Sequence, residues 1–198
     1  MPDRVIKFAF VIEGKGEVGA VPLLVRRICN EILGIFAVKT SRPVRIARSK
    51  LVRPGELERA IRLAQTINQA PGPILVLLDA DEDCPAILGP RLKSRALAIT
   101  RDNDLSVVIP KFEFETWFLS AARSLSGLRG LREELQAPPD PEAVRGAKEW
   151  LSRNMVPGKK YSPAVDQAAL VAGMDLAAAR SCASFDRLCR EIARLVSS

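Results

Sequence analysis

Three acidic side chains directly follow apolar segments of the chain and could together hold a divalent cation. Glu13 follows the apolar run 5–12, and Asp79 and Asp81 follow the run 74–78. If these runs are parallel strands of one sheet, their ends lie at the same edge, where ligand sites of such sheets form. Uncompensated carboxylates at that edge would repel one another. Mg²⁺ or Mn²⁺ would remove the conflict, since Mg²⁺ takes oxygen ligands and is held by one or two carboxylates plus phosphate.

The spacing of the two aspartates also suits one shared ion. In an extended segment, residues two apart point to the same side, so Asp79 and Asp81 would face one cation together. Taken alone the spacing is a weak signal, because a solvated acidic turn is the commoner explanation. The preceding run, 74–78, is apolar throughout, which is typical of a central parallel strand and strengthens the signal.

Two glutamates, Glu113 and Glu115, follow a further apolar run at 105–109 and would reach the same edge. Their neighbours Phe112, Phe114, Trp117 and Phe118 are aromatic, and a buried carboxylate normally needs a partner. Glu115 is therefore either a further metal ligand or positioning group, or an acid at a helix N-terminus that the helix dipole stabilises. Both interpretations stay open at this point.

The elements that position these acids alternate along the first 110 residues. Strands are predicted by the apolar runs at 5–12, 44–47, 74–78 and 105–109. Helices are predicted by apolar residues at helical spacing over 17–33, over 54–69 and near 86–98. This alternation predicts an α/β fold with a small parallel sheet of about four strands, right-handed crossovers and flanking helices.

Beyond Pro110 the pattern is helical only. We expect an α/β core over residues 1–125 and a C-terminal helical extension over residues 126–198 that packs on the core. No apolar run approaches the roughly 20 residues that a membrane helix needs. The N-terminal apolar run lacks a small-residue cleavage site, so we expect a cytoplasmic protein.

The composition excludes several kinds of catalytic site. The chain has no histidine, which rules out Ser-His-Asp and Cys-His arrangements and the HExxH metalloproteases. Its four cysteines form no Cys-x-x-Cys pair, and we expect them to be free and mostly buried. Carboxylates, lysines, arginines or a metal-bound water would have to move protons.

The net charge of +7 permits an anionic partner, and we expect nucleic acid, DNA in particular. Most basic side chains should form an ordinary solvated surface. A track along some of them would bind phosphates, which supply most non-specific affinity for nucleic acid. The candidates are Arg42, Arg45, Arg48, Lys50, Arg53, Lys159, Lys160, Arg180, Arg187, Arg190 and Arg194.

The segments 11–17 (Val-Ile-Glu-Gly-Lys-Gly-Glu) and 77–81 (Leu-Leu-Asp-Ala-Asp) resemble the TOPRIM domain of topoisomerases, primases and OLD-type nucleases. The resemblance implies that Glu13 is a general acid or base and that Asp79 and Asp81 bind Mg²⁺. Over nearly its full length the chain also resembles a family of small bacterial TOPRIM-like proteins of unknown function. That likeness includes the segments 113–118, 161–167 and 184–188.

From this resemblance we expect Mg²⁺-dependent phosphodiester chemistry on nucleic acid, in the form of a TOPRIM-type nuclease. The candidate catalytic residues are Glu13, Glu17 and Glu115. The candidate metal ligands are Glu13, Asp79, Asp81 and Glu115. A role in anti-phage defence with a partner protein is implied by the same resemblance.

A different interpretation starts from Gly14, Gly16 and Gly19, which match the G-x-G-x-x-G dinucleotide-binding pattern after a strand and before a helix. Glu13 and Glu17 would repel a bound pyrophosphate. The second predicted strand is followed by no acid that could bind a ribose hydroxyl. A dinucleotide-binding oxidoreductase is therefore the less favoured alternative.

The same arrangement of metal-binding acids can also occur in a protein without catalytic activity. The chain would then be a non-catalytic TOPRIM-like partner or sensor module, beside an ATPase encoded nearby. A topoisomerase is disfavoured, because Tyr161 is the sole tyrosine that could act as nucleophile. The chain also lacks the large domains needed to pass a strand.

Overall fold

The computed structural model describes residues 5–101 and 104–197. It contains a parallel sheet in the order β2-β1-β4-β5, in which β3 also pairs with β1. The strands are β1 Ile6–Ile12, β2 Val38–Thr40, β3 Val44–Arg45, β4 Ile74–Leu77 and β5 Leu105–Val108. The predicted α/β fold with a small parallel sheet is confirmed. The strand that the sequence did not indicate is β2, which has only 3 residues and no buried position.

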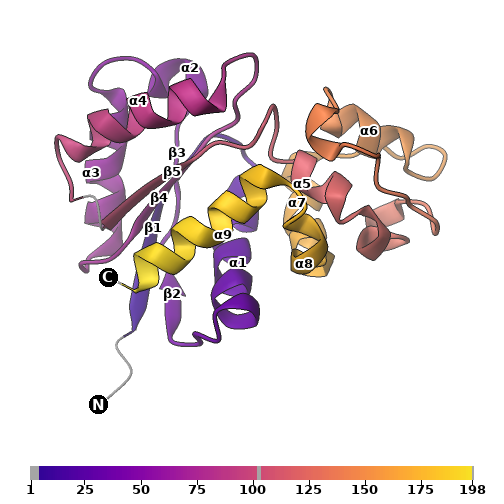
Figure 1. Ribbon diagram of the computed structural model, residues 1–198, viewed down its shortest axis with the longest axis horizontal. Coiled ribbons are helices and arrows are strands. Elements are labelled where there is room, and N and C mark those ends of the chain that lie inside the picture. Colours follow the sequence, from indigo (N-terminus) through magenta and orange to yellow (C-terminus); the bar gives the residue numbers. More distant parts are fainter. Residues whose placement is uncertain (1–4, 102–103, 198) are drawn as a thin grey trace.

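Helices cover both faces of this sheet (Figure 1). One face carries α1 (Glu17–Arg27, continued as a π-helix over Ile28–Ile32) and α9 (Ala183–Val196), and the other carries α3 (Glu56–Asn68) and α4 (Pro85–Leu97). A short helix, α2 (Arg48–Leu51), follows β3.

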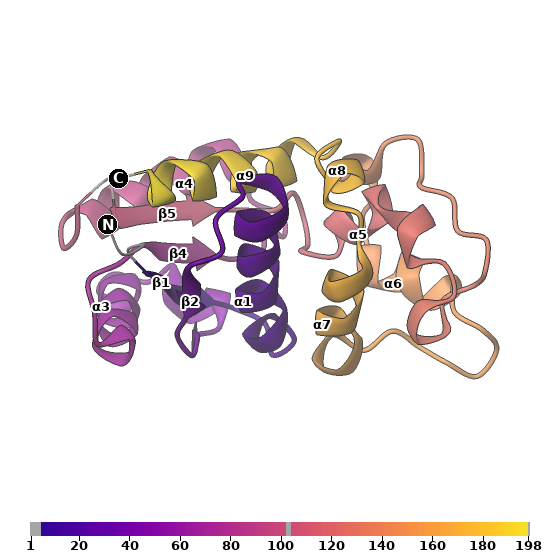
Figure 2. The same cartoon turned by 90° about the horizontal axis from the view of Figure 1, so that it is seen from below.

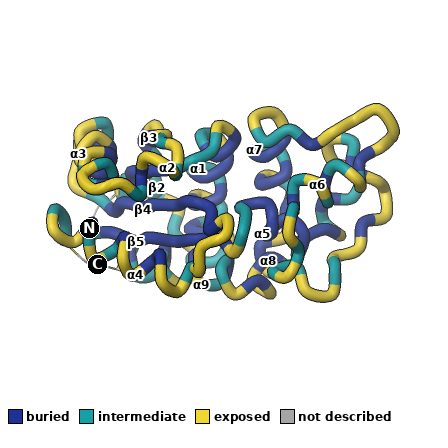
Figure 3. The backbone as a smooth tube through the Cα atoms, turned by 90° about the horizontal axis from the view of Figure 1, so that it is seen from above, coloured by how far each residue is buried: buried dark blue, intermediate teal, exposed yellow. Residues whose placement is uncertain are grey.

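The alternation of β1 assigns its side chains to these two layers. Phe8, Phe10 and Ile12 belong to the hydrophobic cluster under α1 and α9, whereas Ala9 and Val11 belong to the cluster under α3 and α4. All five side chains are fully buried, which explains why β1 is apolar at successive positions. Figure 3 shows β4 and β5 in the colour of buried residues. Burying one large apolar side chain contributes about 1.5–3 kcal/mol.

The remaining helices lie beyond the carboxyl ends of the strands. Figure 2 shows the arrows of β4 and β5 pointing toward this group. Its α-helices are α5 (Thr116–Ser120), α6 (Ala147–Arg153), α7 (Pro163–Gly173) and α8 (Leu176–Ala179). Short 3₁₀ turns at Ala122–Leu125, Leu128–Gly130 and Pro141–Ala143 connect them. The chain then returns to the sheet as α9, beside β5.

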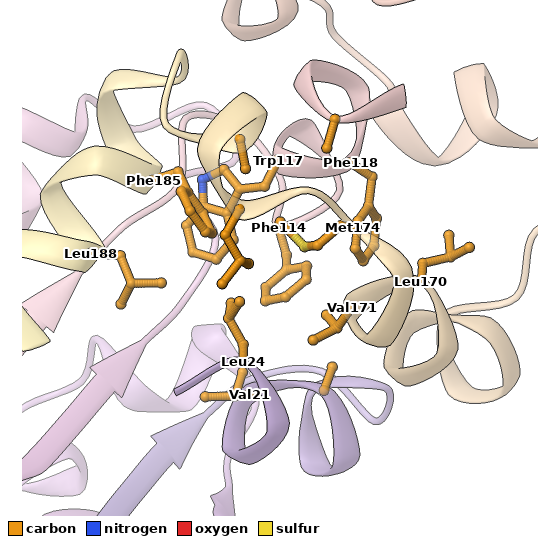
Figure 4. Packing of buried hydrophobic residues seen from close by; sticks show 14 of the residues in the cluster. Val21, Leu24, Phe114, Trp117, Phe118, Leu170, Val171, Met174, Phe185 and Leu188 are labelled. Atoms are coloured by element: carbon orange, nitrogen blue, oxygen red, sulfur yellow. The ribbon is translucent and has the colours of Figure 1, made fainter. Parts of the chain in front are cut away.

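An aromatic cluster joins this helical group to the sheet (Figure 4). The ring of Phe114 lies 4.8 Å from that of Trp117 and 5.6 Å from that of Phe118, centroid to centroid. Trp117 contacts Phe185 of α9 at 5.3 Å and donates a hydrogen bond to Ser184. Each such aromatic pair adds about 0.5–1.5 kcal/mol beyond area burial. The segment between β5 and α5 is therefore held firmly.

The cysteines are free, as expected: Cys29, Cys182 and Cys189 are buried and Cys84 is exposed. Burial raises the pKa of each of the three buried thiols to about 11. Within the described ranges, no helix combines the length and the apolar character that crossing a membrane requires.

Candidate functional site

A cavity of about 340 Å³ lies where the carboxyl ends of β1 and β4 face the start of α7. The acidic residues that line it are Glu13, Glu17, Asp79 and Glu115. The other lining residues are Gly14, Lys15, Lys148 of α6, Ser162, Pro163, Ala164 and Gln167. The structure thus brings together four of the six acids that the sequence singled out, while Asp81 and Glu113 lie outside this lining.

Glu13 follows β1 and is half-buried, with its Oε2 atom buried and lacking a hydrogen-bond partner among the described residues. Burial raises the pKa of Glu13, and the charge of Asp81 raises it further. Arg48 and Lys148 act in the opposite direction. Since Glu13 lines the cavity, its carboxylate is placed to exchange a proton or contact a cation there.

Glu17, the first residue of α1, folds its side chain back over the preceding loop. Its Oε2 atom accepts a hydrogen bond of 3.0 Å from the backbone amide of Glu13. Burial raises the pKa of Glu17 to about 7, against the lowering effect of the amides of Gly14 and Glu13. The charges of Glu115 and Glu13 add to the increase.

This arrangement accounts for the glycine pattern without a dinucleotide. In dinucleotide-binding loops the backbone comes close to a pyrophosphate, whereas here Glu17 accepts the hydrogen bond of the Glu13 amide. A Cβ atom on Gly16 would lie 2.2 Å from both the carbonyl oxygen of Pro163 and Oε1 of Gln167. Glycine at position 16 is therefore needed for the close approach of α7.

Asp79 and Asp81 point in different directions. Asp79 is 8% exposed, and its Oδ1 accepts a hydrogen bond of 2.8 Å from the amide of Phe114. Burial raises the pKa of Asp79 well above its usual range, followed by the charges of Glu17 and Glu115. Asp81 has φ +50°, and its side chain is 54% exposed. A left-handed residue breaks the extended geometry on which the expected shared orientation depended.

Arg48 holds the loop that carries both aspartates. Its Nε lies 3.5 Å from the Asp81 carboxylate and donates to the carbonyl of Asp79 at 3.2 Å. The same guanidinium also donates to the carbonyl of Ala80 and pairs with Asp83. The basic residues around position 48 were expected on the surface or in a phosphate track, but this one fixes the loop after β4.

Glu115 is the most deeply buried acid of the cavity, at 1% exposure. Its Oε1 accepts hydrogen bonds from the Tyr161 hydroxyl at 2.9 Å and from Gln167 Nε2 at 3.4 Å. Burial raises the pKa of Glu115, while Lys148 and Tyr161 lower it. Although Glu115 precedes α5, its side chain makes no capping hydrogen bond. The geometry therefore favours a cavity group over a helix cap.

Lys148 is the site residue that the sequence did not reveal. Its Nζ lies 2.9 Å from Glu113 Oε1, 3.6 Å from Glu115 Oε2 and 3.8 Å from Asp79 Oδ2. Burial lowers the pKa of Lys148, but the charges of Glu115, Asp79 and Glu113 outweigh it and raise the value above its usual range. Lys148 is separated from Glu115 by 33 positions and belongs to no recognisable motif, so only the packing of α6 brings it here.

The oxygen donors of these carboxylates suit a hard cation such as Mg²⁺. Within residues 5–101 and 104–197, no three acidic or cysteine side chains converge closely enough to enclose a metal ion. Mg²⁺, however, usually keeps several waters and takes one or two carboxylates plus phosphate oxygens. Glu13 Oε2 and Glu115 Oε2 are buried without a hydrogen-bond partner in that part of the chain. The residues fit a cation held by one or two carboxylates.

Comparison with known proteins gives one match. No curated protein and no solved structure matches the chain significantly. A family model described as a domain of unknown function, DUF4276, matches residues 12–193. This range includes every acid of the cavity as well as Lys148 and α7. The chain therefore belongs to the DUF4276 family.

Proposed function

We propose that this chain carries out Mg²⁺- or Mn²⁺-dependent phosphodiester chemistry on nucleic acid, as a TOPRIM-type nuclease. The observation that carries the proposal is that Glu13, Asp79 and Glu115 all line one cavity at the carboxyl edge of the sheet. The pKa of each of these carboxyls is raised, by burial in the first place. A divalent cation would stabilise their ionised forms and attract a phosphate.

The sequence resemblance supports the same reaction. A glutamate after the first strand and an Asp-x-Asp after a later one are the features shared with TOPRIM domains. In this proposal Asp79 is the aspartate that faces the cation. Asp81 lies nearer the rim, and its charge raises the pKa of Glu13.

When bound, the metal would polarise the scissile phosphate and lower the pKa of a water molecule. The chain's own residues do the rest. Glu13 transfers a proton, because it lines the cavity, its Oε2 has no hydrogen-bond partner among the described residues and its pKa is raised toward neutrality. Lys148 places a positive charge beside the same acids and would stabilise charge that develops on the phosphate. Tyr161 keeps Glu115 oriented through its hydroxyl.

The test is a cleavage assay on supercoiled plasmid and single-stranded DNA with Mg²⁺ or Mn²⁺. Glu13→Gln keeps the shape of the side chain but removes the titrating group. We expect it to cleave about 10²- to 10⁴-fold more slowly than wild type. Glu134→Gln, an exposed matched control, should cleave normally. Cleavage by Glu13→Gln at the wild-type rate, in a preparation free of contaminating nuclease, would overturn the assignment.

A second candidate is a non-catalytic partner or sensor module. The observation that favours it is the ammonium of Lys148, which lies among Asp79, Glu113 and Glu115 and offsets part of their charge without any metal. Such a module would not cleave DNA, and one whose acids are neutralised by Lys148 would also gain no stability from divalent cations. The cleavage assay, together with thermal melts with and without Mn²⁺, separates the two candidates.

A further inference from the structure

A second, smaller cavity adjoins the acidic one. It has a volume of about 270 Å³, and its charged lining residues are Arg129, Lys159, Lys160 and Asp166. Ser162 lines both cavities, so the two are neighbours across the start of α7. Its lining combines three cationic groups with one carboxylate, a formal charge of +2, next to the acidic cavity.

The backbone around this second cavity is held in place. Leu131 and Met155 form an antiparallel bridge, and the amide of Val156 donates to the carbonyl of the residue before Leu131 at 2.8 Å. The amide of Lys159 donates to the carbonyl of Val156 at 3.1 Å, which closes a tight turn. Gly158 has φ +81° there, the conformation that a type II turn requires after a proline.

The cationic side chains are fixed by the same framework. A Cβ atom on Gly130 would lie 2.6 Å from Cδ of Lys159, so the lysine stem crosses this glycine. Arg129 Nε contacts Asp166 Oδ1 at 3.0 Å, and the other oxygen of Asp166 accepts the amide of Ser162 at 2.9 Å. Both oxygens of Asp166, the one carboxylate among the lining residues of this cavity, therefore already have hydrogen-bond partners.

The ammonium groups of the two lysines, by contrast, are available to an external anion. Both Lys159 and Lys160 are exposed. In the part of the chain that the structure describes, no carboxylate lies within ion-pair distance of either ammonium. Their charge is thus free to bind an anion from outside the protein.

We propose that Arg129, Lys159 and Lys160 bind a backbone phosphate next to the one held in the acidic cavity, which makes the substrate a polynucleotide strand. The inference rests on the proposed function, since it extends the same site by one phosphate. The acidic cavity alone repels a phosphate unless a cation is bound, so it supplies little affinity of its own. Lysine and arginine contacts to phosphates supply the sequence-independent affinity that a strand-binding protein needs.

The test measures binding separately from cleavage. The probe is a labelled single-stranded DNA oligonucleotide, followed by fluorescence anisotropy in Ca²⁺ over a range of KCl concentrations. Lys159→Ala/Lys160→Ala should weaken binding on the order of tenfold and lower the slope of log K against log salt by up to about 0.7, the value for one phosphate contact on a single strand. Arg59→Ala/Arg62→Ala removes the same charge from exposed positions of α3 and should change neither quantity.

Two results would overturn the inference: an unchanged affinity and salt slope in the lysine variant, or an equal loss in the arginine control. Hydrolysis of bis(p-nitrophenyl) phosphate with Mn²⁺ keeps the proposed function distinguishable, because this small diester engages the acidic cavity alone. The lysine variant should hydrolyse it at the wild-type rate. If wild type hydrolyses neither this compound nor DNA, the proposed function fails, while the anisotropy result still decides whether the basic cavity binds a strand.

Discussion

The ammonium of Lys148 lies 3.6 Å from Oε2 of Glu115, so α6 delivers a positive charge to the most deeply buried acid of the cavity. The same ammonium contacts Glu113 and lies near Asp79. A divalent cation that enters the cavity would meet this charge as well as the carboxylates. Lys148 should therefore weaken metal binding while it strengthens phosphate binding.

Lys148→Met tests whether the ammonium weakens metal binding and strengthens phosphate binding. Removing the ammonium should allow Mn²⁺ to bind more tightly, roughly tenfold, or about 1.4 kcal/mol. DNA cleavage should slow, because the charge beside the phosphate is lost. The Mn²⁺ concentration at the midpoint of the thermal shift measures the first effect at pH 8. Lys39→Met, at an exposed position of β2, is the control. A higher midpoint in Lys148→Met would contradict the prediction.

The two aspartates should differ in their effect on metal binding. Wild type should gain about 2.7 kcal/mol of stability at a hundredfold excess of Mn²⁺ over its Kd. Asp79→Asn should lose this gain, because Asp79 faces the cavity. Asp81→Asn should keep most of it, because the Asp81 side chain is exposed beside Arg48. Thermal melts of both variants decide. A full metal shift in the double variant would show that neither aspartate binds the ion.

Glu17 should make stability depend on pH in metal-free buffer. Its pKa rises from 4.5 to about 7 on folding, so between these values the folded state keeps a proton that the unfolded state has lost. Stability is therefore highest below pH 4.5 and falls as pH rises toward 7. The decrease from this group is on the order of 3 kcal/mol.

Glu17→Gln keeps an acceptor for the Glu13 amide but cannot ionise. Urea denaturation of both proteins from pH 5 to pH 8 should show that wild type loses stability relative to the variant. A constant difference in the free energy of unfolding across this range would mean that Glu17 does not titrate there.

Tyr161→Phe should destabilise the protein through Glu115. The variant loses the hydroxyl that donates to Glu115 Oε1 at 2.9 Å, which costs about 1–3 kcal/mol. Because this hydrogen bond lowers the pKa of Glu115, it stabilises the charged carboxylate more than the protonated form, so we expect the loss to grow from pH 5 to pH 8 as the carboxyl ionises. Urea denaturation at both pH values measures the difference. Equal losses would show that the hydroxyl does not favour the charged form.

Alanine substitutions at Gly16 and Gly19 should change the stability of the protein according to how closely each glycine is packed. A Cβ on Gly16 would meet the backbone of Pro163, so Gly16→Ala should cost about 1–3 kcal/mol. The nearest neighbour of a Cβ on Gly19 is Ala168 Cβ at 3.5 Å, an ordinary contact. Gly19→Ala should therefore be neutral or stabilising by up to about 1 kcal/mol, because alanine favours a helix. Chemical denaturation of the two variants tests the contrast, and an equal cost at both positions would contradict it.

Strands with both faces buried can be recognised in the sequence by their runs of apolar residues. The segments of β1, β4 and β5 are mostly apolar because both sides pack against helices, and acids follow each of them within a few residues. That pattern was enough to predict the α/β class and to single out Glu13, Asp79 and Glu115. It could not reveal β2, whose residues are partly exposed and whose length is 3 residues.

The sequence by itself determined which acids follow the buried strands. A strand buried on both faces requires apolar residues at successive positions, so the strand and the acid after it can be recognised from neighbouring residues. Tertiary structure alone decided what surrounds them. Lys148 and Tyr161 reach Glu115 only because α6 and the segment before α7 fold back over the carboxyl edge. Likewise, the left-handed backbone at Asp81 turns its side chain toward Arg48, a direction that Asp-x-Asp spacing does not specify. Such contacts join residues far apart in the chain, and no local periodicity encodes them.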